Sequence, residues 1–220
     1  LLLTLVSARG TESRGVEYTG ALIIVLQVAL IVLLTPGLAA GMIAGEMEGG
    51  SWNLLLVTPL RSGRILRGKL ISVILTLALL LCATLPGYAV IMLIKPALQQ
   101  QVIQVLICLA LAALLSMLVS ATISSFFRST AMATTVSYGM LIAVFGGTML
   151  VWMNRDAPFG YDFVQNALRL NPMAAALNAM QTEGFESYNL VPSTWWITGI
   201  SCGVLLVVLY GQLVRLTRPD

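Results

Sequence analysis

Residues 70–94 read LISVILTLALLLCATLPGYAVIMLI, an apolar run without any Asp, Glu, Lys or Arg. A helix of about 20 such residues crosses the roughly 30 Å of hydrocarbon in a bilayer. None of the long apolar runs alternates polar and apolar residues, as the strands of a membrane barrel would. The sequence therefore predicts an all-α, polytopic helical membrane protein. The other charge-free stretches that exceed this length are residues 18–45, 97–127, 129–154 and 187–214.

The composition supports this class and excludes several kinds of chemistry. The chain is 58% hydrophobic and 10% charged, whereas soluble domains carry about 25% charged residues. Histidine is absent, which removes Ser-His and Cys-His catalysis and the commonest metal ligand. No acidic residue lies inside a span, so a relay of intramembrane carboxylates is not expected. The cysteines Cys82, Cys108 and Cys202 lie in apolar runs, where we expect small hydrophobes without disulfides.

We expect one transmembrane domain over residues 1–220. Residues 1–7 are apolar but too short to cross, and we interpret them as the tail of an earlier helix. Six spans are then expected, with the N-terminal one missing from this sequence. The five visible spans are expected at about 18–44, 69–94, 102–125, 131–153 and 193–214, with an inner connection at 45–68 and an outer region at 155–190.

The distribution of charge predicts the orientation. One set of alternate loops carries seven basic residues and the other carries five. The cluster Arg61, Arg64, Arg67 and Lys69 lies directly before a span, and basic residues favour the cytoplasmic side. We therefore expect residues 45–68 and the C-terminus in the cytoplasm, with Arg64, Arg67 and Lys69 at the membrane interface.

The outer side is marked by aromatic and proline residues. Trp195 and Trp196 are expected to anchor the last span at the outer interface, where tryptophan is enriched. Residues 170–182 are uncharged but too short to span. Asn171-Pro172 is followed by residues with high helix propensity, and proline is favoured in the first turn of a helix. A re-entrant or interfacial helix is therefore expected there.

The charged island at 45–69 reads GEMEGGSWNLLLVTPLRSGRILRGK. Ser51 is a suitable N-cap for a short helix with Trp52 and Leu55 on one face, and Thr58-Pro59 ends it. The pattern predicts a short amphipathic helix on the inner membrane face. A contact with a protein partner and a purely lipid-bound anchor remain open alternatives.

Residues 63–70, GRILRGKL, nearly fit the phosphate-binding loop G-x-x-x-x-G-K-[ST]. Leu70 replaces the magnesium-binding hydroxyl residue, and no strand precedes the motif. We therefore expect no ATP binding by this chain.

Glycines recur every four residues at the end of the first span. Gly37, Gly41 and Gly45 have the small-xxx-small spacing that lets membrane helices approach closely. The alternative is that glycine is simply frequent in membrane helices. Pro36 is expected to kink this span.

The island resembles the permease subunits of the type 2 (exporter) ABC transporter family. The resemblance lies in Glu46-x-x-x-Gly50-Ser51-x-x-x-Leu55-x-x-Thr58-Pro59, followed by Gly68-Lys69. The Leu170-Asn171-Pro172 step and the order of the spans also fit the family. Asn53 stands where the family often has an acid, and Ser51 replaces a threonine.

The resemblance implies that the short helix is a coupling helix docked on a separate ATPase subunit. It also implies two ATPase copies, which carry the ATP and magnesium, a second permease chain, identical or homologous, and a location in the bacterial inner membrane. This chain itself is then expected to bind no cofactor, metal or nucleic acid and to have no catalytic residues. The residues carried over to the ATPase contact are Glu46, Glu48, Gly50, Ser51, Trp52, Leu55, Thr58, Pro59 and Arg61.

Two other function classes are alternatives to an export permease. A non-transporting membrane anchor or regulatory subunit of an ABC-type complex shares the same sequence features. An intramembrane enzyme would need paired acids, histidine or a metal cluster within the spans. The uncharged spans suggest an apolar or amphipathic cargo, and the sequence does not identify the substrate.

Overall fold

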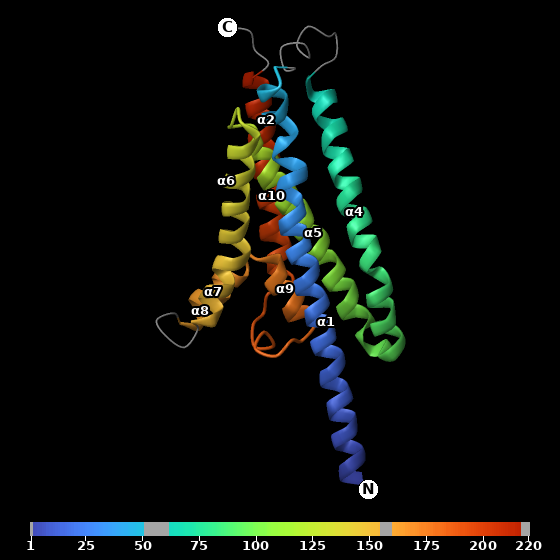
Figure 1. Ribbon diagram of the computed structural model, residues 1–220. Coiled ribbons are helices and arrows are strands. Elements are labelled where there is room, and N and C mark those ends of the chain that lie inside the picture. Colours follow the sequence, from blue (N-terminus) through green and yellow to red (C-terminus); the bar gives the residue numbers. More distant parts are fainter. Residues whose placement is uncertain (1, 51–61, 155–159, 217–220) are drawn as a thin grey trace.

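The computed structural model describes residues 2–50, 62–154 and 160–216, and the side chains of residues 18–50, 67–154 and 160–215. All regular secondary structure in these ranges is helical (Figure 1). Within them, five helices are long and apolar enough to cross a membrane. The prediction of an all-α polytopic membrane protein is confirmed. These candidate spans are Tyr18–Glu48, Arg67–Ile94, Pro96–Ser124, Thr130–Met153 and Ser193–Arg215.

Several consecutive elements adjoin directly, whereas residues 180–192 form a long connection between α9 and α10. The first half of the chain comprises α1 (Leu2–Ala39), α2 (Gly41–Glu48), α4 (Ser62–Ile94), the 3-10 turn η1 (Pro96–Leu98) and α5 (Gln99–Ser124). The second half comprises α6 (Thr130–Ile142), the π-helix η2 (Ala143–Gly147), α7 (Thr148–Met153), α8 (Tyr161–Leu168), α9 (Pro172–Ala179) and α10 (Ser193–Leu216).

The start of the chain differs from the expectation. Residues 1–7 were expected to be the tail of an earlier helix, separate from the span at 18–44, but α1 is continuous from Leu2 through the first span. Residues 1–17 contain no proline, and their two glycines weaken a helix by only about 1 kcal/mol each. Local sequence therefore gives the helix no reason to stop. In Figure 1 this part of α1 extends beyond the other helices.

The opposite end of the first span is divided. Pro36 lies inside α1, and the helix stops at Ala39, with Ala40 as a single residue between α1 and α2. Proline has no N–H, so it cannot donate to the carbonyl one turn earlier. The backbone N–H of Ala40 donates to the carbonyl of Pro36 at 2.9 Å. The expected kink is thus realised as a joint between two helices.

The core is built around α5. In its most apolar stretch 61% of the residues are buried, whereas the share is 17–33% in the other four spans. α5 contacts α1, α4, α6, α9 and α10. Cys108, Leu109 and Ala112 are fully buried on it. α5 is therefore the central helix, and the other spans leave one face free.

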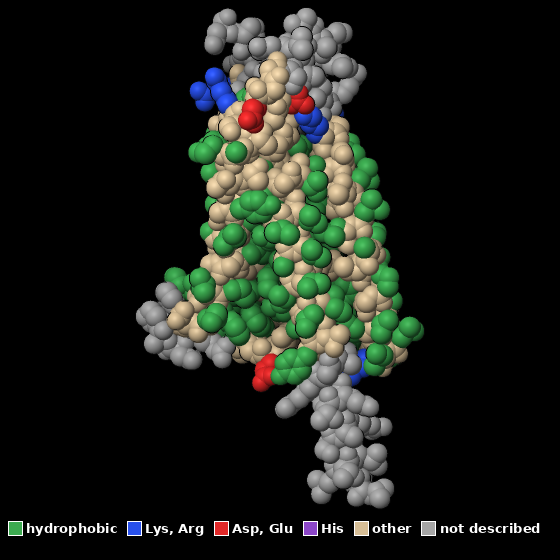
Figure 2. All heavy atoms as spheres, viewed as in Figure 1, with side chains coloured by type: hydrophobic (Ala, Val, Ile, Leu, Met, Phe, Trp, Pro, Cys, Tyr) green, Lys and Arg blue, Asp and Glu red, His purple; other side chains and the backbone are tan. Residues whose placement is uncertain are grey.

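These free faces are apolar. Leu79 and Leu93 on α4 are 71% and 81% exposed, and Figure 2 shows hydrophobic side chains over the middle of the bundle, with charged ones at its two ends. This pattern suits an integral membrane protein, whose apolar faces meet hydrocarbon rather than water.

Candidate functional site

Three chain segments meet at one end of the bundle. The end of α2, the start of α4 and the start of α6 lie together there, beside the last turns of α10 (Figure 1). Three exposed bases belong to this end of the bundle: Arg67 in α4, Arg128 in the turn before α6 and Arg215 in the last turn of α10. This end contains the described parts of the charged island, and we take it as the candidate functional site.

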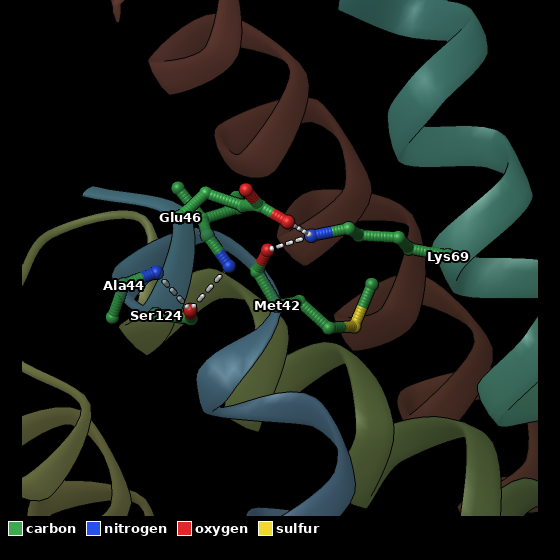
Figure 3. A network of polar contacts seen from close by, with 6 residues as sticks. Met42, Ala44, Glu46, Lys69 and Ser124 are labelled. Atoms are coloured by element: carbon green, nitrogen blue, oxygen red, sulfur yellow. Dashed lines mark hydrogen bonds and ion pairs between the residues drawn. The ribbon is translucent and has the colours of Figure 1, made fainter. Parts of the chain in front are cut away.

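Lys69 links α2 to α4 at this end (Figure 3). Its Nζ lies 2.6 Å from Oε1 of Glu46 and donates to the backbone carbonyl of Met42 at 2.8 Å. The two charged side chains are 33% and 27% exposed, respectively. Because the pair is partly withdrawn from water, salt screens it less than a surface pair. From the sequence, Lys69 was expected at the membrane interface and Glu46 at a partner contact. The structure joins them to each other.

The hydroxyl of Ser124 links α2 to α5 (Figure 3). Its Oγ accepts hydrogen bonds from the backbone N–H groups of Ile43 and Ala44, both at 3.0 Å. Ser124 is fully buried and is the last residue of α5. Sequence analysis did not identify it, because a serine at the end of an apolar helix has many possible roles and its partners lie 80 and 81 positions away.

Glu48 links α2 to α6. Its Oε2 accepts from the backbone N–H of Thr130 at 2.7 Å and also from the Thr130 hydroxyl. Thr130 is the first residue of α6, and a carboxylate at a helix N-terminus is favoured by unpaired N–H groups and the helix dipole. Glu48 therefore braces α6 within this chain.

The three glycines of the first span lie in different surroundings. A Cβ placed on Gly41 would lie 3.4 Å from Thr130 Cγ2, and one on Gly45 would lie 3.8 Å from Thr130 Oγ1. Gly37 has no such neighbour within 4 Å among the described atoms. Two of the glycines thus bring α2 against α6, whereas Gly37 is exposed on the surface of α1.

Only some of the remaining island residues lie within the described ranges. Gly50 follows α2 with a left-handed backbone (φ +69°), a conformation that favours glycine. The backbone of Arg64 lies in α4. The predicted amphipathic helix and the proposed contact residues Ser51, Trp52, Leu55, Thr58, Pro59 and Arg61 lie outside the described residues.

The near match to a phosphate-binding loop lies in a helix. Residues 63–70 form the first turns of α4, and Lys69 is engaged by Glu46. A phosphate-binding loop needs non-helical backbone N–H groups that point at the phosphates. The described residues also contain no cluster of His, Cys, Asp or Glu suited to a metal ion.

The two tryptophans of α10 differ. Trp196 is 74% exposed, as a membrane-interface anchor would be. Trp195 is half-buried, and its Nε1–H donates to Sγ of Cys108 at 3.2 Å. Trp195 therefore joins α10 to α5 rather than only facing the interface.

At the opposite end of the bundle, α9 realises the short helix expected at 170–182. All its residues except Met173 are buried, which favours the re-entrant alternative over the interfacial one. Asn171 is fully buried. It caps α9 by accepting from the N–H of Met173, and its amide donates to the Phe145 carbonyl at 3.1 Å and to Thr148 Oγ1 at 2.7 Å. The cap thereby holds the π-helix η2, the kind of irregular turn often found at functional sites.

Comparison with known proteins agrees with this geometry. No curated protein sequence matches the chain. A family model described as "ABC-2 family transporter protein" matches residues 8–220, which is nearly the whole chain. The chain therefore belongs to the ABC-2 transporter family and is a membrane permease of an ABC transporter.

Proposed function

We propose that this permease is part of an ATP-driven exporter, in which residues 45–68 couple ATP hydrolysis by a separate subunit to movement of the spans. Family membership implies association with an ABC ATPase and with the membrane. In the proposed complex, two ATPase copies hold the ATP and magnesium. A second permease chain, identical or homologous, completes the path, and this chain contributes no catalytic residue. The complex lies in the bacterial inner membrane.

The observation that carries the proposal is the link through Lys69. Its ammonium group joins α4 to Glu46 and to the Met42 carbonyl of α2. The two ends of the 45–68 connection are thus tied to each other by contacts outside its own backbone. A push on the connection then acts on α2 and α4 together instead of being absorbed at one end. This is the mechanical requirement for a coupling element.

The charge at this end supports its placement in the cytoplasm, where the ATPase is. Arg67 and Lys69 lie at the start of one span, Arg128 lies between two others, and Arg215 ends the last. Basic residues next to spans favour the cytoplasmic side. On this basis the C-terminus also lies in the cytoplasm.

Co-purification tests the docking role. A Trp52→Ala, Leu55→Ala double variant is expected to lose the ATPase subunit, because it removes the apolar face predicted for the connecting helix. The matched control is Trp196→Ala, Ile200→Ala, which also removes one tryptophan and one aliphatic residue. These control side chains are 74% and 65% exposed. They lie near the start of α10, far from its last turns at the candidate site. Equal retention of the ATPase by both variants contradicts the proposal.

A second measurement separates transport from anchoring. The wild-type complex in sealed vesicles is supplied with ATP, and hydrolysis and movement of candidate apolar or amphipathic solutes are followed together. Movement that depends on ATP supports the exporter. Hydrolysis without movement of any solute supports the anchoring or regulatory subunit instead.

A further inference from the structure

The joint between α1 and α2 has no cap of its own. Ala40 separates the two helices, and no side chain caps the start of α2 locally. The first N–H groups of a helix have no partner within it. Pro36, one turn earlier, removes a further backbone donor from this region. The start of α2 therefore has backbone N–H groups that no side chain of its own N-cap residue satisfies.

Ser124 supplies a hydrogen-bond acceptor to backbone N–H groups at the start of α2. A hydroxyl oxygen has two acceptor lone pairs, and this one accepts from both Ile43 and Ala44. Ala44, one of the two donors, also belongs to a buried cluster with Ala40 and Ala133. The hydroxyl thus fixes the start of α2 on the end of α5.

The other two attachments of α2 are of a different kind. Lys69 and Thr130 bind the carboxylates of Glu46 and Glu48, which are partly exposed and exposed, respectively. The bonds to Ser124 are buried and lie nearer the joint. Ser124 thus holds the N-terminal part of α2, and the carboxylates of Glu46 and Glu48 hold its C-terminal part.

We propose that Ser124 is a positioning residue that acts as the pivot of α2. It fixes the direction in which α2 presents the following connection to the ATPase subunit. The inference rests on the proposed function for its coupling part only. Loss of the hydroxyl frees the joint, so that a push on the connection bends α2 at Ala40 and is no longer passed to the spans.

Hydrogen–deuterium exchange on the isolated permease in lipid nanodiscs tests the pivot itself. Ser124→Ala is expected to raise exchange of the Ile43 and Ala44 amides, followed in peptides covering residues 41–48, by about 5- to 10-fold, as expected for the loss of one hydrogen bond per amide. The matched control is Ser116→Ala. Ser116 is fully buried on the same helix, and its hydroxyl donates to Ala112 of that helix at 2.8 Å. Equal exchange in both variants overturns the proposal.

Ser124→Cys keeps a weaker acceptor of similar size and is expected to fall between wild type and Ser124→Ala. If Ser124→Ala does not fold, Ser124→Cys tests the pivot by itself. An exchange rate for Ser124→Cys equal to that of wild type overturns the pivot.

The same measurement on the complex with its ATPase tests the coupling part. With Mg-ATP and vanadate, exchange at residues 41–48 of the wild type and of Ser116→Ala is expected to differ from the nucleotide-free state. In Ser124→Ala, exchange is high in both states and the response is lost, although the ATPase still co-purifies. A preserved response in Ser124→Ala overturns the inference. No response in any chain, wild type included, overturns the proposed function and the coupling part together, and the first experiment still decides the pivot.

Discussion

Replacing Lys69 and Glu46 separately should have unequal effects, because Lys69→Met removes both contacts of Lys69, whereas Glu46→Gln leaves an oxygen acceptor for each of them. Lys69→Met removes the 2.6 Å ion pair and the 2.8 Å bond to the Met42 carbonyl. Glu46→Gln keeps an oxygen acceptor for Lys69 and removes only the charge. The comparison therefore isolates the contribution of the backbone contact.

The magnitudes follow from burial. Exposed ion pairs contribute about 0.2–1 kcal/mol, and hydrogen bonds to charged groups about 1.5–3 kcal/mol. Both side chains are about one-third exposed, so we expect about 1 kcal/mol for Glu46→Gln and about 2–3 kcal/mol for Lys69→Met. For a domain of this size, 1 kcal/mol lowers Tm by about 2–4 °C. The expected losses in Tm are thus about 2–4 °C for Glu46→Gln and about 4–12 °C for Lys69→Met.

Thermal unfolding in nanodiscs, followed by tryptophan fluorescence, measures these losses. The double variant should be only slightly less stable than Lys69→Met, because residues in contact do not act additively. The exchange Glu46→Lys with Lys69→Glu restores the ion pair, but a carboxylate cannot donate to the Met42 carbonyl. It should therefore recover part of the stability. Equal losses for the two single variants, or a double variant equal to their sum, refute the assigned contacts.

The other predictions concern buried or capping polar groups. Glu48→Gln should lower Tm by about 1–3 °C, since it weakens the contact with Thr130 at the start of α6, and Thr130→Val combined with it should add little. Asn171→Asp keeps the cap of α9 but loses both amide donors, so it should lower Tm by about 4–8 °C, and Asn171→Ala by more. Tyr88 donates to Gln27 Oε1 at 3.1 Å with both side chains 1% exposed. Tyr88→Phe should therefore lower Tm by about 2–6 °C, with a smaller loss when Gln27→Leu is also present. Thermal unfolding checks each variant against wild type.

The spans could be predicted from sequence because each depends on one local property. A charge-free stretch long enough to cross hydrocarbon specifies a helix almost regardless of its neighbours. The second visible span was expected at about 69–94, and the structure has an apolar helical stretch at Arg67–Ile94 within α4. The same reasoning failed before residue 18, where a separate earlier helix was expected and α1 is instead continuous. Charge decides whether a segment enters the membrane and does not decide whether the helix continues.

The polar contacts could not be predicted, because each joins residues far apart in the chain. Glu46 and Lys69 were both noticed, but for separate outward roles, and their pairing depends on the angle between α2 and α4. Ser124 and Asn171 gave weaker signals still. Pro172 after Asn171 predicts the start of a helix, as found, but the donation of the Asn171 amide to the π-helix depends on the packing of α9 against η2.

The attachments of α2 have unequal consequences for the proposed coupling. Through Ser124, α2 is fixed to α5, which packs against α1, α4, α6, α9 and α10. Through Lys69 it is fixed to α4, whose spanning stretch is only 17% buried. A displacement of α5 would have to disturb packing with all of these neighbours, whereas α4 can shift mainly against lipid. Under the proposed coupling, a push on the 45–68 connection therefore moves α4 relative to α5, with Ser124 as the fixed point.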